Sequence, residues 1–174
     1  VFALFLGLGG GMVRDTMLGN TPFESLRTPW YVLTVILAVI LMLLVGRWIP
    51  VGGSLFMLLD ALTLGLYAAI GTQYAADFEV SWVGCLVVGT AAGVSGGVIV
   101  AVLRGQVPSI LLSGPPYALL GVVGSAIYLV LKDVNGGLAA LACVLAVIAL
   151  RWVTLRFGIT TPTTIAVESA AEGH

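Results

Sequence analysis

Glycines cluster twice inside apolar sequence, and their spacing points most directly to a chemical role. Gly9-Gly10-Gly11 lies in the first apolar segment and Ser95-Gly96-Gly97 lies in a later one. Each glycine costs a helix about 1 kcal/mol relative to alanine. Irregular backbone at membrane depth is tolerated where protein or water satisfies it. The clusters therefore predict kinked or unwound helices whose freed carbonyls and amides face a water-filled path. Close packing of helices through small residues is the alternative.

Asp60 is the second candidate, because it lies inside the apolar window at residues 55–76. An ionisable side chain in a membrane span costs about 2.5–3.5 kcal/mol on insertion scales and is a functional candidate by default. Thr63 and Tyr67 follow it and extend a polar face. The alternative is an interfacial carboxylate near a helix N-terminus, stabilised by the helix dipole.

Arg14 and Asp15 follow the first glycine cluster by one turn. They could gate a path or bind permeant ions or lipid headgroups, and the alternative is a pair of interfacial charges that snorkel out of the membrane. The second cluster lacks this pair, and its nearest charge is Arg104. The regions beside the two clusters are therefore electrostatically unequal.

Composition places these residues in a membrane protein. Hydrophobic residues make up 60% of the 174, charged residues make up 9%, and the mean hydropathy is +1.15. A soluble domain carries about 25% charged residues, so this chain cannot cover itself with a water-facing surface. Long uncharged windows predict helices that cross the bilayer. We expect six spans, at residues 1–18, 29–47, 55–76, 80–103, 114–132 and 136–157.

The same composition argues against several other functions. The net charge is −1 without a basic run, so nucleic acid is not an expected partner. Cys85 and Cys143 each lie in an apolar window and are interpreted as small packing residues. The single histidine is His174, so no zinc, haem or Ser-His-Asp site can be assembled. We therefore expect neither an enzyme nor a resident cofactor.

An internal repeat organises the chain. Identical special residues recur at an offset of 86, at Gly7/Gly93, Gly10/Gly96, Gly11/Gly97, Gly19/Gly105, Pro22/Pro108 and Tyr31/Tyr117. Three crossings separate the first span from the fourth, so the two copies must be inverted. The counterpart of the third span would precede residue 1, and we expect an intact protein of seven spans. The expected units are a first repeat without its first helix, a second repeat, a final helix and a polar, poorly ordered tail, at 1–53, 54–133, 134–158 and 159–174.

Basic residues give a weak indication of orientation. Four arginines fall on the side of the C-terminus, against three basic residues on the other side. The positive-inside rule therefore favours a cytoplasmic C-terminus in a multi-pass protein of the cell membrane.

Two segments resemble a known family. The pattern Gly-Gly-Gly-x-x-Arg-Asp-x-x-Leu-Gly-x-x-Pro, from Gly9 to Pro22, is similar to that of the prokaryotic trimeric intracellular cation channels. This family has also been labelled a glycine-transporter or uncharacterised membrane family. The segment Leu59–Leu66 resembles the opening of the family's fourth helix. The resemblance implies two inverted three-helix repeats, a seventh helix, and glycine-kinked second and fifth helices.

The resemblance also implies a function. It implies a homotrimer in the lipid bilayer, in which each protomer passes monovalent cations, chiefly potassium, along the glycine-rich helices. Asp60, Thr63 and Tyr67 are expected polar contributors, and Arg14, Asp15 and Arg104 are gate candidates. Ser95 and the Val100-Ala101 pair depart from the family pattern, and the second departure weakens a paired-charge gate. Anionic lipid headgroups are candidate partners. The rival function is a secondary transporter of a small amino acid such as glycine, and a lipid-binding module without transport would leave the glycines unexplained.

Overall fold

Six long helices and one short helix form the chain in a computed structural model, which describes residues 2–45, 53–108 and 116–157. The helices are α1 (Phe2–Leu18), α2 (Glu24–Arg27), α3 (Pro29–Val45), α4 (Ser54–Asp77), α5 (Trp82–Leu103), α6 (Tyr117–Leu131) and α7 (Gly136–Arg156). Within the described residues every regular element is helical, so the predicted all-α fold with six long spans is confirmed. The expected polar tail at 159–174 lies outside the described residues.

The surface and lengths of the helices suit a bilayer. α5 and α7 are each long and apolar enough to cross a membrane, and shorter apolar helices occur within α3 and at α6. Large apolar side chains such as Leu43, Val130 and Leu37 are largely exposed. Apolar exposure on this scale is unfavourable in water and favourable against lipid tails. The physical character of the bundle therefore agrees with the predicted polytopic membrane protein.

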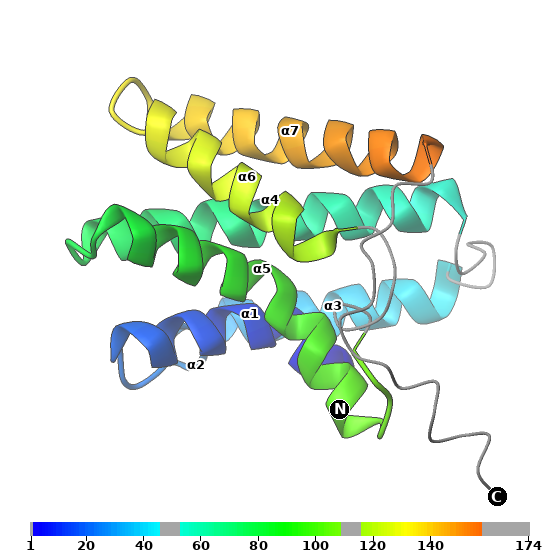
Figure 1. Cartoon of the computed structure of the whole chain (residues 1–174). Coiled ribbons are helices and arrows are strands. Elements are labelled where there is room, and N and C mark those ends of the chain that lie inside the picture. The colour runs from blue at the N-terminus through cyan, green and yellow to red at the C-terminus, as the bar shows by residue number, and fades with distance from the viewer. Residues whose placement is uncertain (1, 46–52, 109–115, 158–174) are drawn as a thin grey trace, which may run out of the picture.

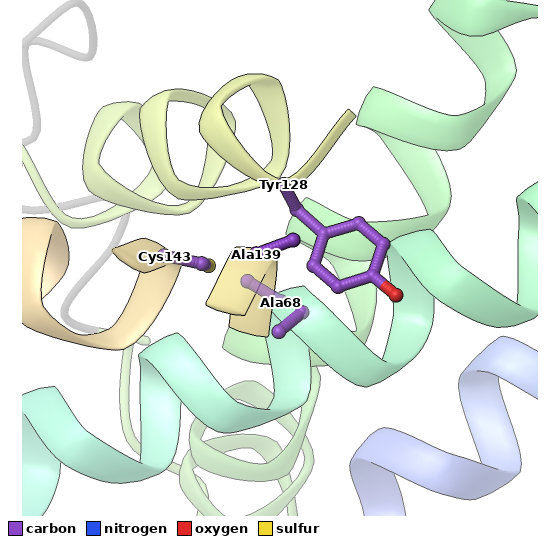
Figure 2. Close-up of a cluster of buried hydrophobic side chains, with 5 residues drawn as sticks. Ala68, Tyr128, Ala139 and Cys143 are labelled. Atoms are coloured by element: carbon purple, nitrogen blue, oxygen red, sulfur yellow. The ribbon is translucent and has the colours of Figure 1, made fainter. Parts of the chain in front are cut away.

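Small residues allow the helices to approach closely in the core. Figure 2 shows Ala68 of α4, Tyr128 of α6, and Ala139 and Cys143 of α7 meeting in one buried cluster. Short side chains bring helix backbones together, and this is how membrane helices gain contact in the absence of a hydrophobic drive. Both cysteines are free and buried, so their interpretation as packing residues is confirmed.

The helices related by the 86-residue offset run in opposite directions. In Figure 1, α1 runs from right to left and α5 from left to right, and α3 and α6 are likewise opposed. This arrangement is what an inverted repeat requires.

The ends of α1 and α5 repeat the same cap. Gly19 and Gly105 follow the two helices with φ angles of 68° and 65°. The amide of Asn20 donates to the Asp15 carbonyl, and that of Gln106 donates to the Ala101 carbonyl, each at 2.9 Å. Both are Schellman caps at matched positions, where glycine adopts a left-handed conformation at little cost. We propose on this basis that the repeats keep the expected boundaries, 1–53 and 54–133, with a final helix at 134–158.

Candidate functional site

The two glycine clusters meet where α1 crosses α5. A Cβ atom on Gly10 would lie 2.6 Å from the carbonyl oxygen of Ala92, and one on Gly96 would lie 2.7 Å from the carbonyl oxygen of Leu6. The offset of 86 relates Gly10 to Gly96 and also Leu6 to Ala92. The two close approaches are therefore equivalent contacts, and the crossing is a local two-fold centre of the repeat.

The prediction of broken helices is wrong for unwound backbone at these clusters, whereas a kinked helix, the other form of the prediction, agrees with the bend of α5 in Figure 1. α1 is continuous helix through Gly9, Gly10 and Gly11, and α5 is continuous through Ser95, Gly96 and Gly97. α5 bends along its length in Figure 1 without losing its helical pairing. The glycines at the crossing have no side chain, so the backbone of the other helix packs directly against them. The free energy gained from this packing offsets the helix propensity that glycine loses relative to alanine. Close packing, the alternative interpretation, accounts for Gly9, Gly10 and Gly96.

The third glycine of each cluster has no such explanation. A Cβ on Gly11 or Gly97 would meet no atom within 4 Å among the described residues. These two positions are again related by the offset of 86. The packing of the protomer therefore leaves both glycines free for a role in flexibility or in close approach of another group.

Tyr67 links α4 to this crossing. Its ring lies against Gly10, where an added Cβ would be 2.7 Å from the ring, and its hydroxyl donates a hydrogen bond to the Gly7 carbonyl. Beside this bond lies a cavity of about 520 Å³. It is lined by Gly7, Leu8, Thr28, Trp30, Tyr31, Thr34, Val35 and Tyr67. Hydroxyl and carbonyl oxygens on its walls are groups that can replace water around a cation.

Arg14 and Asp15 form a buried ion pair near the C-terminal end of α1. Their side chains are 7% and 0% exposed, and the Arg14 Nη2 atom lies 2.6 Å from Asp15 Oδ1. The guanidinium stacks 3.7 Å from the centroid of the Tyr74 ring on α4. Asp15 Oδ2 accepts the Glu24 amide at 2.8 Å, which caps the start of α2. The alternative of charges snorkelling into water is therefore wrong, because both side chains are enclosed by protein.

Asp60 joins a second polar cluster, formed by α4, α6 and α7. The Tyr117 hydroxyl donates to Asp60 Oδ1 at 3.0 Å, and Arg151 Nη2 lies 3.5 Å from Asp60 Oδ2. The Arg151 guanidinium also lies 5.1 Å from the centroid of the Tyr117 ring. Arg151 is one of the four arginines counted above on the side of the C-terminus, and its partnership with Asp60 is not predicted from the sequence. Its position within the last apolar span, where a charge is costly, was the signal that could have identified it.

The remaining candidates are not brought to the crossing. Thr63 is exposed, and its hydroxyl donates to the Leu59 carbonyl of its own helix. Arg104 is exposed at the C-terminal end of α5. No side-chain hydrogen bond among the described residues joins either residue to Tyr67.

Sequence reasoning missed a group of buried hydroxyls between α4, α5 and α6. A Cβ on Gly89 would overlap the Thr72 hydroxyl and come within 2.5 Å of the Ser125 hydroxyl. Thr72 donates to the Ala68 carbonyl, whereas the Ser125 and Thr90 hydroxyls find no partner among the described residues. Hydroxyls between apolar helices hold membrane helices together when they are paired. A serine flanked by small residues in an apolar span was the available signal.

The fold and these contacts define an α-helical, polytopic membrane protein with an inverted repeat that crosses at paired glycines. The sequence model of the family described as "Glycine transporter" matches residues 1–47 and 57–133, and the chain belongs to this family. The resemblance to the trimeric intracellular cation (TRIC) channels is confirmed by the same match together with the solved structures below.

Similar proteins match most of this chain, which spans about three quarters to four fifths of their length. A UPF0126 membrane protein of Deinococcus radiodurans is 28% identical over 158 residues, which cover 90% of this chain and 74% of that protein. A TRIC cation channel was solved in a structural study of conductance. It superposes on this chain with a TM-score of 0.79 at 29% identity, over 89% of this chain and 77% of that one. The TRIC trimeric intracellular cation channel orthologue from Rhodobacter sphaeroides gives a TM-score of 0.76 at 29% identity, over 88% and 80%.

Proposed function

We propose that this protein is a monovalent cation channel with potassium as its permeant ion. The observation that carries the proposal is the shared fold with two TRIC cation channels, each 29% identical over nearly nine-tenths of this chain. Identity at that level over nearly nine-tenths of the chain favours a common mode of action over a common fold alone. A channel needs no enzyme chemistry and no resident cofactor.

We further propose that the cation path runs beside the crossing of α1 and α5. The cavity at Tyr67 and Tyr31 offers hydroxyl oxygens and the Gly7 carbonyl at the level where the two helices are closest. Such oxygens stabilise a partly dehydrated cation without binding it so tightly that it cannot leave. Gly11 and Gly97, which packing does not require, act in this proposal as hinges on either side of the crossing.

The charged clusters have supporting roles in this scheme. The Arg14–Asp15 pair is buried and fixes the connection between α1 and α2. We therefore propose that it holds the helix beside the path in place. Asp60 is half-buried and partnered by Tyr117 and Arg151. Its charge lies near the N-terminal end of α4, away from Tyr67. Arg104 remains a candidate for an outer end of the path, and Thr63 remains a polar candidate one turn before Tyr67 on α4.

The assembly and placement are part of the proposal. A homotrimer with one path in each protomer follows the trimeric orthologue from Rhodobacter sphaeroides. A multi-pass location in the cell membrane, with a cytoplasmic C-terminus, follows from the apolar helices and from the excess of arginines on that side. Anionic lipid headgroups are proposed partners.

Planar-bilayer recording of the purified full-length protein tests the channel. We expect discrete unitary currents in potassium salts, with a reversal potential that follows the potassium gradient. The family's description keeps the secondary-transporter alternative as a second candidate, although the likeness to channels favours conduction. Saturable glycine uptake into vesicles without unitary currents would overturn the channel. Tyr67→Phe and Tyr31→Phe provide matched variants on the two walls of the proposed path.

A further inference from the structure

A second hollow lies away from the crossing, between the start of α4 and the end of α7. These antiparallel helices bring the N-terminus of one beside the C-terminus of the other, at the right of Figure 1. The hollow has a volume of about 310 Å³, and Ser54, Arg151, Trp152 and Arg156 are among the residues that line it. We call it the α4/α7 groove. It shares no lining residue with the cavity at Tyr67.

Positive charge gathers at this groove. Arg151 is 15% exposed, gives one Nη2 contact to Asp60, and keeps a buried Nε without a partner among the described residues. Arg156 is exposed on the same wall. α4 begins here after Gly53, which supplies no side-chain cap. The first amides of a helix carry partial positive charge and lack partners within the helix. The positive charge of two arginines and a helix N-terminus therefore exceeds the single negative charge of the Asp60 carboxylate.

The other walls of the groove are apolar. Met57 and Leu58 come from α4, and Ile148 and Leu155 come from α7. Trp152 lines the same hollow and is 66% exposed. Tryptophan is enriched where acyl chains meet lipid headgroups, because its ring is apolar and its N–H is polar. The groove thus pairs a basic head with an apolar flank at the level of a membrane interface.

We propose that the α4/α7 groove binds an anionic phospholipid, with the phosphate at Arg151 and Arg156 and the acyl chains along the apolar wall. Arginine recognises phosphate through paired N–H donors, and the unpartnered Nε of Arg151 offers one of them. A free phosphate would use the basic head alone and make no contact with the apolar wall. The complementarity of both parts therefore favours a lipid over a soluble anion.

Quenching of Trp152 by brominated lipids tests this site directly. The full chain carrying Trp30→Phe, Trp48→Phe and Trp82→Phe is reconstituted in phosphatidylcholine vesicles. Equal amounts of brominated phosphatidylglycerol or brominated phosphatidylcholine are then added. We expect the anionic lipid to quench Trp152 more strongly. Arg156→Gln is expected to lower this preference about fivefold, the effect of one basic residue near an anionic surface.

Matched variants separate a site from general surface charge. Arg104→Gln removes another exposed arginine, at the end of α5, and is expected to leave the preference unchanged. Arg151→Gln tests the buried head of the groove. Arg156→Gln is the primary variant, because Arg156 is exposed and has no side-chain partner among the described residues, so its loss leaves the fold intact.

Four results would overturn the lipid site. Equal quenching by the two lipids removes the preference altogether, and an equal fall in Arg104→Gln assigns it to overall charge. Loss of the preference on adding inorganic phosphate assigns the basic head to a soluble anion. Absence of quenching by either lipid indicates that a second copy covers the groove. Quenching requires no ion flux, so failure of the channel proposal and failure of this one are distinguishable.

Discussion

Gly10 of α1 and Gly96 of α5 are equivalent residues that each admit a backbone carbonyl of the opposite helix. A Cβ atom added at either position would lie 2.6 Å or 2.7 Å from the facing carbonyl oxygen, so neither site has room for a side chain. The helices remain continuous through this contact, and the repeat makes it symmetric. A change in the crossing would therefore act on both repeats at once, since neither helix can shift without altering the contact of the other.

Alanine at Gly10 is expected to destabilise the protein, and alanine at Gly11 is not. The Gly10 Cβ would clash with a backbone oxygen and with Tyr67, which forces a shift of the kind that costs about 1–3 kcal/mol. The Gly11 Cβ meets no atom within 4 Å among the described residues, so Gly11→Ala should gain up to about 1 kcal/mol of helix propensity. Thermal unfolding of the two purified variants in detergent measures the difference. Equal melting temperatures would contradict the account of the crossing.

Gly11→Ala combined with Gly97→Ala is expected to raise thermal stability and to reduce open probability. Both substitutions fit without a clash, so any loss of current arises from lost backbone freedom. Single-channel recording and thermal unfolding of the same preparation provide the two readouts. Gly136→Ala, at the first residue of α7, is a control glycine far from the crossing. Unchanged open probability in a stabilised double variant would remove the hinge role.

Tyr67→Phe removes the hydrogen bond to the Gly7 carbonyl while the ring stays in place against Gly10. A neutral hydrogen bond contributes about 1 kcal/mol, so we expect a modest fall in stability and an altered unitary conductance. Tyr31→Phe is the comparison variant: Tyr31 lines the same proposed path, but its hydroxyl makes no hydrogen bond within the described ranges, so we expect a smaller change in conductance. Conductance that changes equally in both variants would assign the effect to cavity polarity and not to this bond.

The sequence was sufficient for the spans and the repeat, because apolar windows and special residues at one offset are local signals. Gly19 and Gly105 show this well, since their matched positions carry matched left-handed caps. Whether the helices that carry the glycine clusters are continuous could not be predicted in the same way. A glycine weakens an isolated helix, yet Gly96 sits in a helix that the carbonyl of Leu6 approaches from the neighbouring helix. That contact depends on tertiary packing.

The partners of the charged side chains were equally difficult to predict from the sequence. Arg151 and Asp60 are 91 residues apart and meet only because α7 packs beside α4. The sequence predicts that Asp15 acts together with Arg14. The second carboxylate oxygen of Asp15 caps α2, a helix of four residues that no apolar window predicts. Charges in apolar sequence can therefore be recognised as unusual, whereas their partners require the fold.

Arg14→Met is expected to destabilise the protein by about 3–5 kcal/mol, because it leaves Asp15 buried without its charge partner. Arg14→Met combined with Asp15→Asn should cost less than the sum of the single changes, since the amide is neutral and its oxygen can still accept the Glu24 amide. A double-mutant cycle by denaturant unfolding in detergent gives the coupling. Lys132→Met, Asp133→Asn and their double variant form the control cycle, since that pair is exposed and should show a coupling near zero. Additive effects at Arg14 and Asp15 would show that the two charges act separately, which their 2.6 Å contact argues against.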